Sequence, residues 1–178
     1  MKFVDDKLKE YIEENVLPEY NKNERAHGIE HINYVIKRSF DLVEQNNLDI
    51  DHNKVYVIAA YHDIGAHIDR KTHEIISANI MAEDKNLKQY FSNEDLNVIK
   101  EAIEDHRASS DHEPRSIYGK IVSSADRNNT VESCLERSYY YGKKYNPEFT
   151  DRELYERAFK HLNLKFGVGR LCKILFKR

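Results

Sequence analysis

Apolar residues recur along most of the chain at steps of three and four positions, which is the spacing that places side chains on one face of an α-helix. A helix is predicted over about residues 52–63, and because it is apolar on nearly all sides we expect it to be central. The clearest amphipathic stripe predicts a helix over residues 28–46 and comprises Ile29, Ile32, Ile36, Phe40 and Val43.

Capping residues predict where two further helices begin. Thr72 is expected to cap a helix that runs to about residue 84. Its apolar residues are expected to face inward, and these are Ile75, Ile76 and Ile80. Ser92 and Asp95 resemble a capping box, and the helix that they open carries one apolar stripe, made of Leu96, Ile99 and Ile103.

The C-terminal third of the chain is also predicted to be helical. Pro114 is expected to start a helix that runs to about residue 128, and a tyrosine-rich helix follows over residues 131–144. Thr150 and Glu153 cap a last segment, which glycines break at positions 167 and 169. We find no internal repeat and no linker. The predicted fold class is therefore all-α, a compact single-domain bundle of seven or eight helices over residues 1–178.

Composition narrows the setting of this bundle. Charged residues make up 33% of the chain and hydrophobic residues 40%, with a net charge of −3, which is typical of a globular domain. No apolar run approaches the ~18 residues of a membrane span, and the N-terminus lacks the apolar core of a signal peptide. Cys134 and Cys172 are too few for a disulfide framework. We expect a cytoplasmic protein that binds neither membranes nor nucleic-acid polymers.

Candidate chemistry enters where the central helix ends. His62 and Asp63 close its apolar run, and Ile64 and Gly65 follow directly. An imidazole and a carboxylate are thereby placed inside the core, where unpaired polar groups are strongly unfavourable. A divalent metal ion would satisfy both groups, because imidazole nitrogen and carboxylate oxygen suit Zn, Fe, Mn or Co.

Four further residues stand near the inner ends of apolar segments. His106 continues the third apolar stripe, Asp126 ends an apolar helix, His31 flanks the first stripe and His73 begins its helix. Each has an ordinary alternative, such as a hydrogen-bonded core histidine for His106, an ion pair with Arg127 for Asp126, or a solvated helix start for His73. Together they favour a metal site. Since neither cysteine has ligand spacing, an open N/O site suited to hydrolysis fits better than a structural zinc site.

The order His31, His62-Asp63, Asp126, with the tag His62-Asp63-Ile64-Gly65, resembles the HD-domain metal-dependent phosphohydrolase superfamily, in particular its small bacterial single-domain members. The resemblance covers about residues 25–129. It includes the segment from His27 to His31, which is similar to an HGxxH motif of small bacterial HD hydrolases. The resemblance implies an all-α bundle in which four residues hold one divalent ion: His31, His62, Asp63 and Asp126.

The resemblance extends to the two-metal branches of the superfamily. His73 and His106 fall where those branches have ligands to a second ion, and residues 102–126 resemble the symmetrical diadenosine tetraphosphate hydrolases. Two ions per chain are implied, drawn from Mn, Fe, Mg, Co, Ni or Zn, with Asp63 bridging them through its two oxygens. Ala66 stands where the HD-GYP branch has a lysine, and no GYP segment follows. Cleavage of cyclic dinucleotides is therefore not expected.

The activity that the resemblance implies is hydrolysis of a phosphate ester or anhydride of a nucleotide or dinucleoside polyphosphate by metal-activated hydroxide. Asp63, His27 and Arg107 are the expected catalytic residues, with His27 as general acid and His67 as the second choice for that role. A hydrogen-bonding role beside the ligands is an equal alternative for His27. Four basic residues are candidate phosphate contacts: Arg107, Arg115, Lys120 and Arg127. For Arg115 and Lys120, an ordinary surface charge is the stronger alternative.

Two other functions stay open. One is a non-catalytic HD domain that senses a nucleotide, and such domains typically lack one or more ligands. The other is a di-iron HD oxygenase, which needs six ligands and a substrate pocket without basic residues. The expected partner is a small phosphorylated substrate, with a nucleotide favoured by analogy. A homodimer is compatible with exposed tyrosines at 139–141 and with the apolar residues Leu171, Ile174, Leu175 and Phe176.

Overall fold

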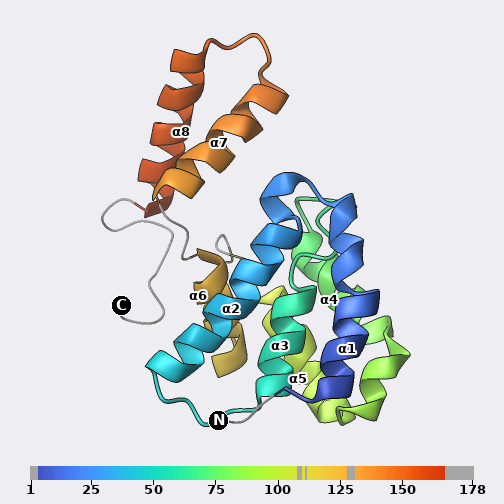
Figure 1. The fold of residues 1–178 in the computed structure, drawn as a ribbon. Helices are drawn as coiled ribbons and strands as arrows, with labels where there is room; N and C mark the ends of the chain where they lie inside the picture. The colour runs from blue at the N-terminus through green and yellow to red at the C-terminus, as the bar shows by residue number, and fades with distance from the viewer. Residues whose placement is uncertain (1–3, 108–109, 111, 128–130, 167–178) are drawn as a thin grey trace. The chain divides into compact units, whose positions relative to one another are not determined.

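The computed structural model describes residues 4–107, 110, 112–127 and 131–166 (Figure 1). These residues form eight α-helices and three short 3₁₀ helices, with no β-strand among them, which confirms the all-α fold class. The α-helices are α1 (Asp6–Asn15), α2 (Ile29–Gln45), α3 (His52–Tyr61), α4 (His73–Glu83), α5 (Asn93–Glu104), α6 (Ile117–Arg127), α7 (Val131–Tyr145) and α8 (Asp151–Phe166). The 3₁₀ helices are η1 (Leu17–Lys22), η2 (Arg25–His27) and η3 (Lys85–Gln89).

The chain divides into two compact units, Met1–Asp126 and Arg127–Arg178. In the second unit, α7 and α8 pack against each other as a helical hairpin. The single domain expected over residues 1–178 stays a prediction. Within the described part of the chain, no helix is both long enough and apolar enough to cross a membrane.

Helix α3 is the centre of the first unit, as its apolar sequence predicts. Every residue from Val55 to Tyr61 is buried, and α3 packs against α1, α2, α4 and α5. Neighbouring helices stabilise an apolar helix of this kind because packing against each of its faces removes apolar surface from water. Figure 1 shows α3 between α2 and α1.

The predicted helix starts are confirmed at one cap and differ in detail at another. Ser92 and Asp95 form a capping box, with the side chain of each bonded to the backbone of the other. Thr72 takes the N-cap position of α4, but its hydroxyl donates to Asp69 (2.7 Å) instead of closing the cap. The expected inward position of Ile75 is wrong, because this side chain is 46% exposed. The buried face of α4 begins at His73. Ile75 comes two positions later, about 200° around the helix, and therefore lies on the opposite face.

Other expectations about the helix ends need correction. Helix α6 begins at Ile117, not at Pro114, since the backbone N–H of Arg115 donates to the Asp105 carboxylate (2.7 Å) and holds the chain in a loop. The short helix α1 was not expected, because its apolar stripe contains few residues. The predicted breaks and apolar residues near the C-terminus lie outside the described residues: Gly167, Gly169, Leu171, Cys172, Ile174, Leu175 and Phe176.

The turn between α3 and α4 runs unusually close to α4. A Cβ added to Gly65 would lie 2.7 Å from Cγ2 of Ile76 and 3.0 Å from the backbone nitrogen of Ser77. The N–H of Gly65 donates to the Ser77 hydroxyl (3.0 Å). Glycine is thus needed here for close approach, and the approach holds the end of α3 against the start of α4.

Candidate metal centre

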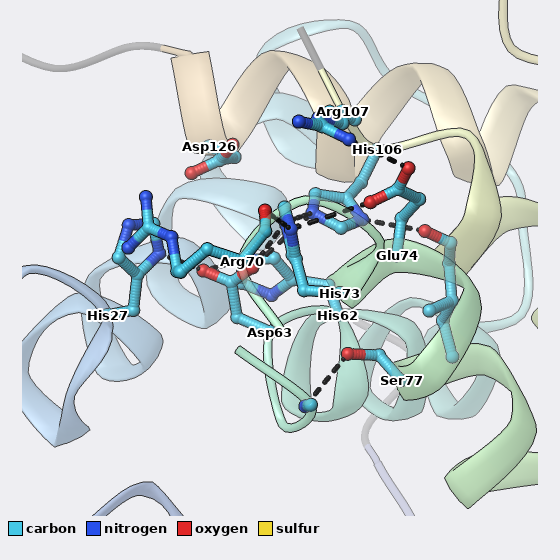
Figure 2. Close-up of polar contacts among 12 residues, drawn as sticks. His27, His62, Asp63, Arg70, His73, Glu74, Ser77, His106, Arg107 and Asp126 are labelled. Carbon is cyan, nitrogen blue, oxygen red and sulfur yellow. Dashed lines mark hydrogen bonds and ion pairs between the residues drawn. The ribbon is translucent and has the colours of Figure 1, made fainter. Parts of the chain in front are cut away.

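Four histidines and two carboxylates converge in the first unit, where the ends of its helices meet. Figure 2 shows these residues except for His31. They are the six predicted ligands: His31 on α2, His62 and Asp63 after α3, His73 at the start of α4, His106 after α5, and Asp126 near the end of α6. Residues from five separate helices and their ends therefore form one cluster. Asp63 and His62 are almost completely buried in it.

The two oxygens of Asp63 face different histidines. Oδ2 lies 3.5 Å from Nε2 of both His31 and His62. Oδ1 lies 3.2 Å from Nε2 of His73 and 3.4 Å from Nε2 of His106. Asp126 Oδ1 joins the first pair, at 3.3 Å from His31 Nε2. The carboxylate of Asp63 therefore stands between two histidine pairs, the arrangement needed to share its oxygens between two ions.

Backbone hydrogen bonds orient three of these histidines in the same way. In each, Nδ1 lies within hydrogen-bond distance of the carbonyl oxygen three residues earlier: Ala59 for His62 (2.8 Å), Arg70 for His73 (3.0 Å) and Ile103 for His106 (2.6 Å). A ring that donates from Nδ1 keeps its lone pair on Nε2 when neutral. Each ring thus presents a metal-binding nitrogen to Asp63, and the backbone sets its tautomer and orientation.

Three polar atoms at the centre of the cluster are buried without a hydrogen-bond partner in the described part of the chain: His31 Nε2, His62 Nε2 and Asp63 Oδ1. Leaving such atoms unsatisfied is unfavourable by about 1–3 kcal/mol each, and by more for a charged group. Each can donate a lone pair to a metal ion once its nitrogen or oxygen is deprotonated, and all three residues belong to sets of His and Asp atoms lying within 4.8 Å of one another. The chemistry of the cluster therefore fits a divalent metal ion.

The cluster holds its carboxylates ionised. Burial acts to raise the pKa of Asp63, but the surrounding histidines outweigh it and hold this pKa well below its usual range. The pKa of Asp126 is also lowered, against burial, chiefly by His31. Burial lowers the pKa of His62 to about 4. For His31 burial acts in the same direction, but Asp126 and Asp63 outweigh it and raise the pKa to about 9. His62 is therefore neutral at pH 7 and ready to bind a metal ion.

His27 contacts the cluster directly. Its Nδ1 lies 2.5 Å from Asp63 Oδ2, and its side chain is buried. Asn23 donates from its side chain to the backbone carbonyls of both His27 (2.9 Å) and Asp63 (3.0 Å). This geometry matches the hydrogen-bonding alternative for His27. His67 is exposed, and its Nδ1 lies 3.1 Å from the carbonyl of Ile64.

The predicted cations are placed unequally. Arg107 donates to Glu74 (3.0 Å) and to the carbonyl of Lys71, and the other oxygen of Glu74 lies 3.4 Å from His73 Nδ1. Arg107 is thus paired with Glu74, which lies beside the ring of the predicted ligand His73. Arg115 uses its guanidinium on Asp105 and Glu104, so its charge is already balanced within the fold.

The last two predicted cations lie on α6. Lys120 is half-buried there, and Arg127 belongs to the second unit. Their contacts with a phosphate stay predictions.

Sequence reasoning missed three residues that lie beside the cluster: Asn23, Arg70 and Glu74. In Figure 2 the side chain of Arg70 extends across Asp63 toward the side of the cluster where His27 lies. The position of Arg70, three residues before His73, was a usable signal, because a histidine at a helix start can take its backbone acceptor from the residue three positions earlier. Asn23 had no comparable signal, since it reaches Asp63 across 40 residues of chain.

Comparison with known proteins gives these residues a family context. The model of the HD domain family matches residues 28–129, which is more than half of the chain and includes all six predicted ligands. A crystal structure described as a predicted HD superfamily hydrolase, from an uncultured Thermotogales bacterium, is similar with a TM-score of 0.56 and 21% identity. The similarity covers 87% of this chain and 86% of that chain, and it confirms the fold. No curated protein matches the chain.

Proposed function

The chain belongs to the HD-domain family, and we propose that it is a metal-dependent phosphohydrolase that cleaves a phosphate ester or anhydride. The observation that carries this proposal is the position of Asp63, whose two oxygens face separate histidine pairs. Nucleotides and dinucleoside polyphosphates are the favoured substrates by family analogy. A cytoplasmic location, a small phosphorylated partner and a homodimer remain part of the proposal.

The residues divide into two ligand groups that share one carboxylate. His31, His62, Asp63 and Asp126 would hold one ion, and His73 and His106 would hold a second together with Asp63. Bound divalent ions supply Lewis acidity and make water a nucleophile at neutral pH. His27 would fix the Asp63 carboxylate through their hydrogen bond. Arg107 would act through Glu74, which lies against the ring of His73.

A di-iron oxygenase is the second candidate, because all six ligands that it requires lie in the cluster. The basic side chain of Arg70 beside the cluster favours a phosphorylated substrate over a neutral organic one. A nucleotide sensor is less favoured, since such domains typically lack ligands and this cluster has the full set.

The test is metal analysis together with a hydrolysis screen of mononucleotides and dinucleoside polyphosphates. Wild type is compared with Asp63→Ala and with a matched control, Asp41→Ala, which removes a half-buried carboxylate away from the cluster that pairs with Lys37. We expect metal-dependent phosphate release by wild type and by the control, and none by Asp63→Ala. Iron binding without turnover of any phosphorylated substrate would favour the oxygenase. A folded wild type that binds no metal would contradict the proposal.

A further inference from the structure

The turn that precedes His73 is held in place by its own side chains. Asp69 Oδ1 accepts the backbone N–H of Lys71 (3.0 Å), and Oδ2 accepts the hydroxyl of Thr72 (2.7 Å). Between them, the carbonyl of Arg70 lies 3.0 Å from Nδ1 of the ligand His73. The backbone of Arg70 is therefore fixed directly beside the cluster.

The side chain of Arg70 leaves this turn across the cluster. Figure 2 shows it running over Asp63 to the side where His27 lies. The residue is exposed, so its guanidinium can meet a ligand that arrives from solvent. Among the described residues its guanidinium has no hydrogen bond or ion pair, whereas Arg107 is paired with Glu74 and Arg115 with Asp105 and Glu104. Arg70 is thus a cation beside the cluster whose charge no carboxylate balances.

We propose that Arg70 binds the non-bridging oxygens of the phosphoryl group that the metal centre holds. This inference rests on the proposed function and assigns the anion-binding side chain of that site. A guanidinium offers parallel N–H donors that match two phosphate oxygens, and its charge adds to that of the ions. Asp69 is a positioning residue in this scheme, because it holds the turn from which Arg70 extends.

The experiment measures binding of inorganic phosphate to the metal-loaded protein by titration calorimetry. Arg70→Gln removes the charge and keeps the backbone carbonyl that orients His73, so metal content should stay at the wild-type value. Lys71→Gln is the matched control, since it removes the neighbouring exposed cation of the same turn. We expect Arg70→Gln to weaken phosphate binding on the order of 10- to 100-fold, Arg70→Lys to weaken it less, and Lys71→Gln to change it less than about twofold.

The outcomes separate this inference from the proposed function. Tight phosphate binding by wild type and equal binding by Arg70→Gln, at the same metal content, would overturn the role of Arg70 alone. A metal-loaded wild type that binds no phosphate and hydrolyses no phosphorylated substrate would overturn both. An equal loss of affinity in Lys71→Gln would show that general surface charge, and not the placement of Arg70, causes the effect.

Discussion

Replacement of Gly65 by alanine tests whether close packing of the turn after α3 holds the metal centre together. The added Cβ would lie 2.7 Å from Ile76 Cγ2, 2.9 Å from Ile76 Cβ and 3.0 Å from the backbone nitrogen of Ser77. Ordinary carbon contacts begin near ~3.5 Å. The first contact is thus short by about 0.8 Å, and the other two involve atoms that move only with α4. Alanine therefore requires α4 to shift away from the turn.

The expected loss of stability follows from this overlap. Overpacking of a buried site destabilises proteins by about 1–3 kcal/mol, which corresponds to a decrease in Tm of roughly 2–12 °C for a chain of this size. The shift also changes the metal centre, because α4 begins at His73, whose Nε2 lies 3.2 Å from Asp63 Oδ1. Metal–ligand distances tolerate only about 0.2 Å. We therefore expect Gly65→Ala to weaken the binding of the ion at His73 and His106 most.

The assay is thermal unfolding followed by circular dichroism, since the chain has no tryptophan for fluorescence, with metal content measured on the same samples. The double variant Gly65→Ala/Ile76→Ala provides the control. It removes the closest contacting atom, so it should lose less stability than the sum of the two single variants. Unchanged Tm and unchanged metal content in Gly65→Ala would refute the steric explanation. So would strictly additive effects in the double variant.

Three further predictions concern the metal centre. Glu74→Gln should lower metal affinity or activity about 10- to 100-fold, because it weakens the contacts of Glu74 with His73 and Arg107. The control is Glu44→Gln, on an exposed part of α2, and equal values in both variants would exclude a role of Glu74 in metal binding. Mn²⁺ at 100 times its Kd should stabilise the protein by about 2.7 kcal/mol, seen as a higher Tm that a chelator reverses; no shift would indicate that the cluster binds no metal. Apparent metal affinity should rise with pH by up to about tenfold per unit between roughly pH 6 and 9. The reason is that the raised pKa of His31, about 9 without metal, leaves this ligand protonated below that pH, so that binding must displace a proton. Calorimetry in two buffers of different ionisation enthalpy would measure that proton, and a flat profile would contradict the prediction.

Local sequence was sufficient for most helices and for naming the residues that the structure brings into one cluster. The helix predicted over 28–46 is α2, and the capping box at Ser92 is present, because both depend on contacts within about four residues. The pair His62-Asp63 was visible for the same reason, as two polar residues at the end of an apolar run. Where the local pattern contained a conflict, prediction failed: Ile75 is apolar yet exposed, because His73 and Ser77 determine which face of α4 is buried.

Only the tertiary structure decided how the predicted residues divide their roles. It placed one oxygen of Asp63 against each histidine pair, bound Arg107 to Glu74 and Arg115 to Asp105, and left Arg70 extended across the centre. These contacts join residues that are far apart in the chain, and they depend on how the helices cross. Periodicity specifies which face of a helix is buried, but the distance and angle between two helices come from the packing of side chains on both. By itself the sequence therefore determined most of the helices and the set of donors, and packing determined which donor faces which partner.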